Sequence, residues 1–330
     1  MKLRLLGGVL AATLTAAPAT FAQAPAAPLP AEQPAAAPAA PAAPAKLSLS
    51  TLRVVRGSVL AGDRWVVRGT LSPYVPGQQV VVRAYRGSKK LSAKRLTVKR
   101  AGGAGRFRLT MRLSGAGRVT IRASHRASAE LLTAVAGPLR VQVVARSAAA
   151  GSRGIAVRRL QTRLAARGYV IGTRGLYDDR TARAVMAFRK LAGMTRAYNA
   201  DEEVFRRLAR GQGAFRVRYP GHGRHIEADI THQVMALIEG RKVSRIYPIS
   251  SGAPVTPTIL GSFRVYLKSP GTNAKGMVHS SYFIRGYAIH GFASVPAYPA
   301  SHGCLRVPVP DAASIFAWVR PGTAVDTYYR

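Results

Sequence analysis

The sequence predicts a multidomain chain that holds a β-sandwich, a small all-α module of three helices and a mostly-β C-terminal domain. Three observations point to this. Short apolar alternations with regular turn signals fill residues 46–146, helical periodicity runs through residues 150–211, and strand-like runs dominate residues 212–330. Alternation along the chain is typical of half-buried strands, whereas apolar residues spaced three and four apart form one face of a helix. The 330 residues leave room for two or three domains.

The N-terminus predicts export. In residues 1–24, Lys2 and Arg4 precede an apolar stretch from Leu5 to Leu14, and small residues follow, as in a signal peptide. Residues 25–45 are almost wholly Ala and Pro, which predicts an extended, semi-rigid linker. We expect a protein of the cell wall or a periplasm-like space, with no transmembrane segment apart from the signal peptide. An uncleaved signal would instead act as a membrane anchor.

Residues 46–146 have the pattern of an antiparallel β-sandwich. Alternating runs such as Trp65–Arg68, Gln79–Tyr85 and Arg118–Arg122 are separated by turn signals such as Pro76-Gly77. By fold-level analogy we expect an immunoglobulin-like spacer whose arginines face solvent. The segment holds no catalytic constellation, and His125 is expected to be an ordinary surface residue.

Residues 150–211 predict three helices. Val157, Leu160 and Leu164 fall on one face of the first, and Val185 and Phe188 on one face of the second. The order of motifs resembles the small three-helix peptidoglycan-binding module, and the residues that carry the resemblance are Val157–Gln161, Gly168-Tyr169, Gly175–Asp178 and Ala184–Phe188. The resemblance implies wall binding through the polar loops of residues 172–179, or a role as a spacer only. Arg189 departs from the glutamine that is usual in the family.

The charge balance is strongly basic, with 50 Lys and Arg against 13 Asp and Glu and a net charge of +37. Such a surplus predicts polyanionic partners, and an exported chain meets anionic wall polymers or acidic lipid headgroups. We expect no nucleic acid partner, because the basic residues are scattered rather than clustered on one element. The alternative is a basic surface that is merely solvated.

Chemistry is concentrated near the C-terminus. Cys304 is the only cysteine, so in an exported chain it is a free thiol or bridges two molecules. It follows Ser301, His302 and Gly303, and His290 lies upstream. A thiol becomes a nucleophile when a nearby imidazole takes its proton, and such pairing is expected to lower the pKa of the thiol.

The upstream histidine lies in a predicted strand. If residues 284–291 are extended, Gly286, Ala288 and His290 share one face, and the two small residues leave a trough for an extended peptide. Further strands are predicted over residues 215–218, 233–238 and 263–267.

These motifs resemble the catalytic domain of the L,D-transpeptidases. The residues that carry the resemblance are Ser250–Gly252, Thr256–Thr258, Gly261–Phe263, Tyr287–Gly291, Ser301–Arg306, Asp311–Val319 as a helix and Gly322–Val325 as a closing strand. Two departures are notable: only ten residues separate His290 from Ser301, and Arg306 stands where many members have asparagine.

The resemblance implies a mechanism and residue roles. Cys304 would be the nucleophile, His290 its base and the Gly291 carbonyl the orienter of the imidazole, with backbone N–H groups of Gly303 and Cys304 in an oxyanion hole. Further roles fall on His302, which would assist the oxyanion or hold the turn, and on the substrate-binding residues Arg306, Ser301 and Tyr287. For Arg306, an ion pair with Asp311 is an equal alternative.

The implied reaction acts on peptidoglycan stem peptides. A thioester acyl-enzyme would release terminal D-Ala and then form a 3→3 crosslink, with no cofactor and no metal.

Three alternatives stay open. A papain-like hydrolase normally places its cysteine before its histidine, the reverse of the order here. A zinc site from His222, His225, His290, His302 and Cys304 lacks the usual ligand spacings. The third alternative is a peptidoglycan-binding wall protein with an inactive or hydrolytic catalytic domain.

Overall fold

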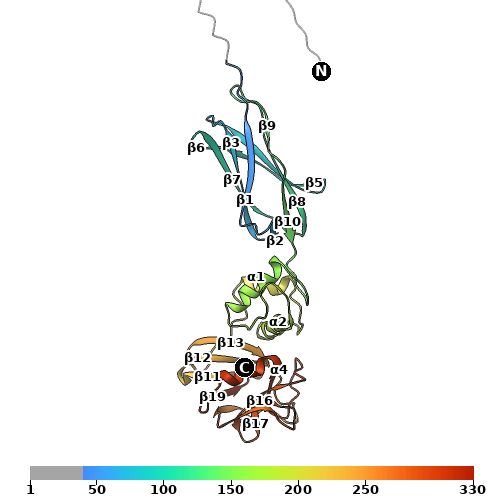
Figure 1. Cartoon of the computed structure of the whole chain (residues 1–330), viewed down its shortest axis with the longest axis vertical. Coiled ribbons are helices and arrows are strands. Elements are labelled where there is room, and N and C mark those ends of the chain that lie inside the picture. Colours follow the sequence, from blue (N-terminus) through green and yellow to red (C-terminus); the bar gives the residue numbers. More distant parts are fainter. Residues whose placement is uncertain (1–39) are drawn as a thin grey trace, which may run out of the picture. The chain divides into compact units, whose positions relative to one another are not determined.

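The computed structural model describes residues 40–330. The predicted signal peptide 1–24 and most of the predicted linker 25–45 lie outside the described residues. Along the described chain a strand-rich part comes first, a helical part follows and a second strand-rich part ends the chain (Figure 1). Between residues 40 and 330 no helix has the length and apolar character needed to cross a bilayer.

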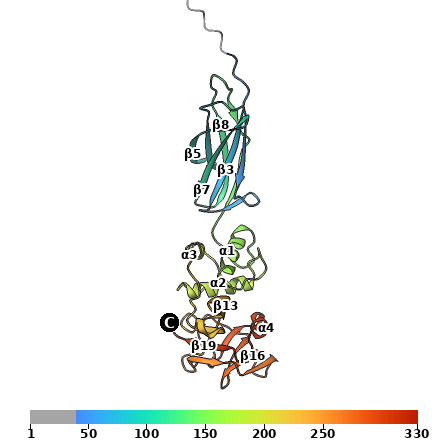
Figure 2. The same ribbon diagram turned by 90° about the vertical axis from the view of Figure 1, so that its left-hand side faces the viewer.

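The first part is built from two β-sheets that enclose a common core (Figure 2). Its strands are β1 (Lys46–Leu52), β2 (Ser58–Leu60), β3 (Arg64–Ser72), β4 (Gln79–Arg86), β5 (Lys89–Thr97), β6 (Lys99–Ala101), β7 (Ala104–Arg112), β8 (Gly117–His125), β9 (Ala134–Val135) and β10 (Leu139–Val144). One sheet has the order β1-β3-β7-β6. The other has the order β2-β10-β8-β4-β5, with β9 paired to β8.

Alternation along these strands sets the sandwich core. Val67 and Leu71 of β3 are buried, whereas Arg68 and Thr70 between them are exposed. One expectation was wrong: His125 is not a surface residue but is 3% exposed, with Nδ1 hydrogen-bonded to the Gln79 carbonyl at 2.9 Å. It ends β8 on the inward side of the alternation, which overrides the usual exposure of histidine.

The three predicted helices are present as α1 (Ile155–Ala165), α2 (Asp179–Leu191) and α3 (Glu202–Ala209). Asp178 caps α2 by accepting a hydrogen bond from the Thr181 N–H at 2.9 Å, and Asp201 caps α3 in the same way. Arg189 is buried and pairs with Asp201 at 2.7 Å, so the residue that departs from the module's usual pattern ties α2 to the start of α3.

The third part consists of two sheets and one helix. Its elements are η1 (Pro220–His222), β11 (Arg224–Asp229), β12 (Val234–Glu239), β13 (Lys242–Pro248), β14 (Gly261–Arg264), β15 (Leu267–Thr272), β16 (Val278–Ile284), β17 (Tyr287–Phe292), β18 (Leu305–Pro308), α4 (Val309–Trp318) and β19 (Ala324–Tyr328). The sheet β13-β12-β11-β19-β14 and the sheet β15-β16-β17-β18 share one apolar core with α4.

Two predicted strands differ in the structure. Residues 215–218 form no strand, because the N–H of Arg218 is bonded to the Glu227 carboxylate rather than to a neighbouring strand. Residues 263–267 are not one strand, since β14 ends at Arg264 and β15 begins at Leu267 in the other sheet. Buried Val265 lies where the chain passes between the sheets.

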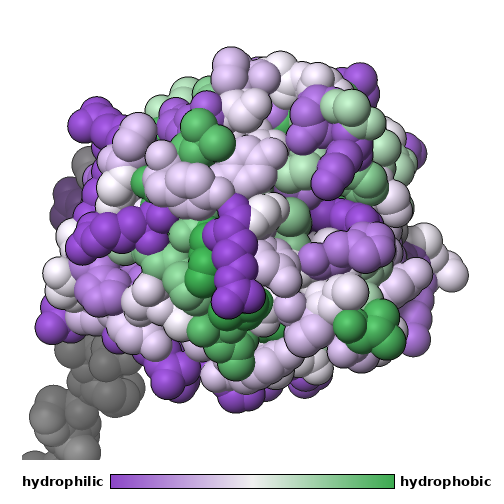
Figure 3. All heavy atoms as spheres, turned by 90° about the horizontal axis from the view of Figure 1, so that it is seen from below, coloured by the Kyte–Doolittle hydropathy of each residue, from purple (hydrophilic) through white to green (hydrophobic). Residues whose placement is uncertain are grey.

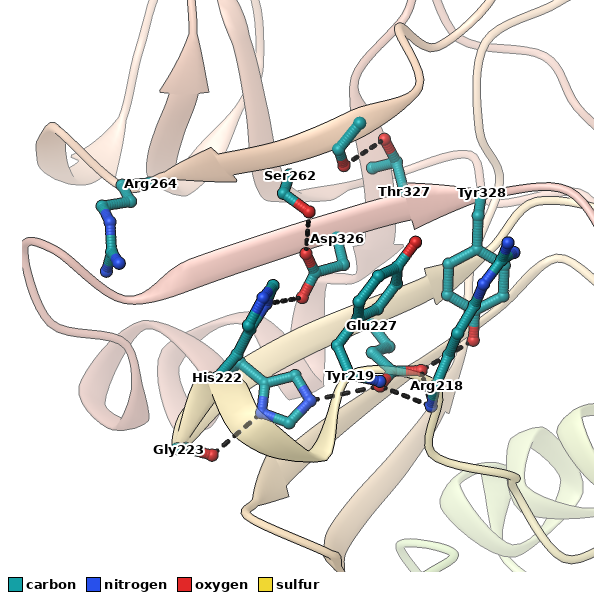
Figure 4. A network of polar contacts seen from close by, with 12 residues as sticks. Arg218, Tyr219, His222, Gly223, Glu227, Ser262, Arg264, Asp326, Thr327 and Tyr328 are labelled. Carbon is teal, nitrogen blue, oxygen red and sulfur yellow. Dashed lines mark hydrogen bonds and ion pairs between the residues drawn. The ribbon is translucent and has the colours of Figure 1, made fainter.

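A buried polar cluster joins the chain ends of this part (Figure 4). Glu227 accepts hydrogen bonds from the N–H groups of Arg218 and Tyr219 and from the Tyr328 hydroxyl, each at 2.8 Å. His225 Nε2 lies 3.2 Å from the same carboxylate. Burial opposes ionisation of Glu227, but these donors outweigh it and lower the pKa of the carboxyl. The cluster therefore fastens the segment before β11 to β19.

The helical module and the third part share a core. Phe188 of α2 belongs to the same apolar cluster as Val234, Ala236 and Ile246 of β12 and β13. At its edge, Lys190 of α2 is 4% exposed and donates to the carbonyls of Gln233 at 3.1 Å and Ile249 at 3.0 Å. These contacts make the helices a structural support of the β-sheets.

Burial of Lys190 has a measurable consequence for stability. Desolvation, with the nearby Arg196 charge, lowers the pKa of Lys190 to about 7. The folded protein therefore binds fewer protons than the unfolded chain above pH 7, so the stability cost of burying Lys190 falls as pH rises toward its unfolded pKa. We expect the unfolding free energy of the wild type, relative to Lys190→Met, to increase by up to about 1.4 kcal/mol per pH unit above 7.

Denaturant unfolding at pH 6 and pH 9 measures this difference. The exposed Lys242 provides the matched control, Lys242→Met, whose difference from the wild type should stay constant between the two pH values. A Lys190→Met difference that is equally constant would contradict the expectation.

Candidate active site

Parallel pairing of β17 with β18 brings the sequence-predicted residues together. Ile289 is the register partner of Leu305, and His290 that of Arg306. Cys304 directly precedes β18, so it lies beside the start of β17. The thiol lies 3.8 Å from the Gly286 carbonyl and receives a hydrogen bond from the Ala288 N–H.

His290 is held in one orientation. The ring is 3% exposed, and its Nδ1 lies 2.9 Å from the Gly291 carbonyl. A carbonyl only accepts, so Nδ1 carries the proton and Nε2 is left as the basic nitrogen. Phe292, two residues on along the same face, meets the imidazole edge to face with ring centroids 5.7 Å apart. The Arg306 guanidinium also stacks on Phe292, 4.2 Å from the ring centroid.

Burial sets the ionisation of the pair. It raises the pKa of the Cys304 thiol, although the Ala288 N–H and the Arg306 charge oppose the shift. It also lowers the pKa of His290. The expected lowering of the thiol pKa is therefore reversed, because desolvation outweighs the Ala288 N–H and the nearby positive charges, and at neutral pH both groups are uncharged.

The turn before Cys304 is closed by its own serine. The Ser301 hydroxyl, buried with the rest of its residue, accepts from the Gly303 N–H at 3.1 Å and donates to the Cys304 carbonyl at 2.6 Å. Gly303 has φ of +107°, a region that favours glycine, and a Cβ there would lie 1.8 Å from the Tyr287 ring. His302 is exposed on the same turn.

A neighbouring segment holds this turn from outside. Ser251 O accepts from the Ala300 and Ser301 N–H groups at 2.9 Å each. Thr256 Oγ1 donates to the Ser301 carbonyl at 3.0 Å, and Thr258 Oγ1 to the Gly303 carbonyl at 2.9 Å. Every one of these contacts uses backbone of the turn, so the segment fixes the turn's shape together with the Ser301 side chain.

A further residue fixes the segment itself. Gln233 is fully buried with φ of +55°, and its amide donates to Ser251 Oγ at 2.6 Å and accepts from the Ser251 N–H at 2.8 Å. Lys190 contacts the backbone carbonyl of the same glutamine. Sequence reasoning missed Gln233, since a glutamine next to a strand has no distinctive spacing; Phe292 could have been found from its alternation with His290.

Arg306, a predicted substrate-binding residue, lies next to the site without an acidic partner among residues 40–330. Arg306 is half-buried and does not pair with Asp311, which instead binds Arg180 at 3.1 Å and Arg183 at 3.0 Å. The alternative ion pair was therefore wrong, because α2 supplies closer guanidinium groups.

Two histidines of the zinc alternative have carboxylate partners. His222 lies 3.0 Å from Asp326, and His225 lies 3.2 Å from Glu227. In residues 40–330 no group of three or more His, Cys, Asp or Glu side chains is arranged to hold a metal.

Two family profiles match the chain. The L,D-transpeptidase catalytic domain matches residues 223–326, and the putative peptidoglycan binding domain matches residues 153–208. The chain is also similar to the crystal structure of the L,D-transpeptidase (residues 123–326) from Xylanimonas cellulosilytica. The two are 32% identical over 55% of this chain and 97% of that one, with a TM-score of 0.50.

The chain belongs to the L,D-transpeptidase family. It is also 28% identical to the catalytic domain of the Enterococcus faecium L,D-transpeptidase, over 32% of this chain and 98% of that one, with a TM-score of 0.28. No curated protein matches the chain. This L,D-transpeptidase thus carries a peptidoglycan-binding domain before its catalytic domain.

The surface of the catalytic domain is chemically mixed. Seen from the end of the chain that this domain forms, hydrophilic side chains (purple) lie between apolar ones (green) across the whole visible face (Figure 3). Exposed apolar residues of the domain include Tyr266, Leu267 and Tyr298.

The Gly303 geometry predicts the effect of a single methyl group. Gly303→Ala should destabilise the protein by about 2–5 kcal/mol, because the added Cβ enforces a strained φ and overlaps the Tyr287 ring. Gly286→Ala is the matched control, since a Cβ at Gly286 meets open space. Chemical denaturation of both variants gives the comparison, and equal stability of the two would refute the packing argument.

Proposed function

We propose that this chain is an exported cysteine L,D-transpeptidase that joins peptidoglycan stem peptides through a thioester acyl-enzyme. The observation that carries the proposal is the pairing of β17 with β18, which sets a thiol-bearing turn beside a histidine of fixed tautomer. Family membership supports the reaction class, and the peptidoglycan-binding domain supports the substrate.

In the proposed acylation, His290 Nε2 takes the proton of the Cys304 thiol as sulfur attacks the carbonyl of the third stem residue. The tetrahedral intermediate collapses when the imidazolium returns that proton to the leaving D-Ala amine, which leaves a thioester. An acceptor amine then attacks the thioester, its proton passes to His290, and thiol and a 3→3 amide crosslink result. A positioned base contributes about 10²–10⁴ to the rate of such steps.

Uncharged resting groups favour this order of events. Because burial raises the pKa of Cys304 and lowers that of His290, the proton transfer accompanies attack rather than preceding it. The Gly291 carbonyl supports the imidazolium that forms, through the 2.9 Å bond to Nδ1. This charge exists only during reaction, so the interaction is stronger in the transition state than at rest.

We assign the turn residues separate roles. With the Gly303 N–H bonded to Ser301, the Cys304 N–H is the oxyanion donor, and Gly303 acts through its positive φ and the absence of a side chain. Exposed His302 faces incoming substrate. Arg306, free of an acidic partner among the described residues, binds a stem carboxylate, and Tyr287 lines the turn.

We assign to the remaining parts of the chain the task of bringing the enzyme to the cell wall. The signal-like residues 1–24 and the Ala/Pro linker 25–45 support export to the wall, and the net charge of +37 supports contact with anionic wall polymers. We further propose that residues 46–146 form an immunoglobulin-like domain. The strand orders β1-β3-β7-β6 and β10-β8-β4-β5 support this, since they correspond to the A-B-E-D and G-F-C-C′ sheets of that fold.

Replacing the sole thiol tests the nucleophile. Cys304→Ala should remove all acyl-enzyme and all crosslinking, while thermal unfolding stays close to that of the wild type because the side chains are similar in size. Intact-protein mass after incubation with a tetrapeptide stem measures the adduct, and His302→Ala is a control that retains the thiol. Crosslinked product from Cys304→Ala would rule the mechanism out.

The pH profile tests the base. Neutral imidazole is required, and burial lowers the pKa of His290, so the acid limb of kcat/KM should have its midpoint below about 6.5. His290→Ala should reduce kcat by about 10²–10⁴ and abolish this limb, whereas His302→Ala should keep it. Initial rates on a soluble stem from pH 4.5 to pH 8 decide between the two histidines; an acid limb lost in His302→Ala would reverse the assignment.

A further inference from the structure

Two cavities lie where the helical module meets the catalytic domain, and each draws residues from both. The first, about 290 Å³ in volume, is lined by Arg183, Phe292, Ala293, Val295 and residues 308–310. The second, about 560 Å³, is lined by residues 171–173, 178–180, Arg183 and Pro310. Because Arg183 and Pro310 line both, the cavities meet at one place.

The junction between the cavities is a fixed structure. The carboxylate of Asp311, 3% exposed, binds Arg180 Nε at 3.1 Å and Arg183 Nε at 3.0 Å, and Arg180 Nη2 donates to the Pro310 carbonyl at 2.8 Å. Two guanidinium groups against the Asp311 carboxylate leave one positive charge at the junction, while Asp178 and Asp179 line the larger cavity beside it. The junction and its surroundings thus offer both positive and negative groups to a polar ligand.

One end of this path lies next to the catalytic histidine. Phe292 lines the smaller cavity and contacts His290 edge to face, with Arg306 stacked on it. Farther along, the loop after β17 is braced by the module, since Arg196 donates to the Ala297 carbonyl. Phe292 therefore connects the wall of the smaller cavity to the His290 ring.

The other end lies on the module. The larger cavity is formed by the loop before α2, where Asp178 accepts the Thr173 N–H at 2.6 Å and so fixes the loop's shape. This loop belongs to the region that matches the peptidoglycan binding domain. Its Thr173 and Asp179 side chains are exposed and polar, which suits the hydroxyl groups of a glycan.

We propose that the two cavities form one substrate groove, in which the loop of residues 171–180 holds the glycan strand and the Phe292 side admits its stem peptide to Cys304. This inference rests on the proposed function and adds that the enzyme selects stems still attached to glycan. Binding energy from the remote glycan would be used at the reacting carbonyl, so unattached stems react more slowly.

Bulky residues placed in each cavity test the groove. Soluble glycan fragments of several disaccharide repeats that carry tetrapeptide stems are compared with the free tetrapeptide, at high salt to screen non-specific attraction to the basic surface. The wild type should have kcat/KM higher by about tenfold or more for the glycan-linked stem. Thr173→Trp and Ala293→Trp, at opposite ends of the path, should remove most of that preference.

Ala165→Trp is the matched control, because Ala165 is exposed on α1 of the same module and lines neither cavity. It should keep the full preference for glycan-linked stems. Thermal unfolding checks that each variant is folded, and the two groove variants serve as independent tests if one is not. Equal kcat/KM for the two substrates in the wild type, or an undiminished preference in both folded groove variants, would overturn the groove. Absence of turnover of either substrate by the wild type would instead refute the proposed function.

Discussion

The parallel pairing of β17 with β18 is the contact on which the site depends. A parallel pair needs a crossover connection, and here residues 293–304 supply it as an irregular segment instead of a helix. Such a segment leaves backbone groups that must be satisfied elsewhere. Ser251, Thr256 and Thr258 satisfy those of the turn that ends in Cys304. The thiol is thus positioned by backbone contacts made some 50 residues earlier in the chain.

Support for the turn extends into the helical module. Gln233 holds Ser251, and Lys190 of α2 holds the backbone on both sides of that contact. The module also contributes Phe188 to a core shared with β12 and β13. Removing the helices would therefore expose apolar surface of the catalytic domain, and a role in wall binding is better examined by surface substitutions than by deletion.

Four acidic residues of this basic chain have structural roles in the catalytic domain. Glu227, Asp229, Asp311 and Asp326 are all buried, although carboxylates are seldom buried without partners. Each is paired with histidine, arginine or both. These carboxylates are thus paired locally with basic side chains, and the chain as a whole keeps its net charge of +37.

Much of the fold followed from the sequence because it is encoded locally. Alternation gave the sandwich strands, helical spacing placed Val157, Leu160 and Leu164 on a buried face, and the motifs around His290 and Cys304 indicated the family. The bounds of strands were harder to predict. Residues 215–218 alternate between apolar and basic as a strand would, yet the Glu227 carboxylate accepts the backbone N–H of Arg218. A bond to a side chain farther along the chain leaves no periodic signal.

Only the tertiary structure decided the remaining features. His125 is buried by the fold, and Asp311 forms ion pairs with Arg180 and Arg183 rather than with Arg306. Burial also raises the pKa of the Cys304 thiol, which pairing with an imidazole alone would lower. Each outcome depends on desolvation and on which partner comes nearest, and both quantities are set by residues distant in sequence. The sequence determined which chemical groups this protein carries and which elements bear them. Folding determined their neighbours, and hence their ionisation.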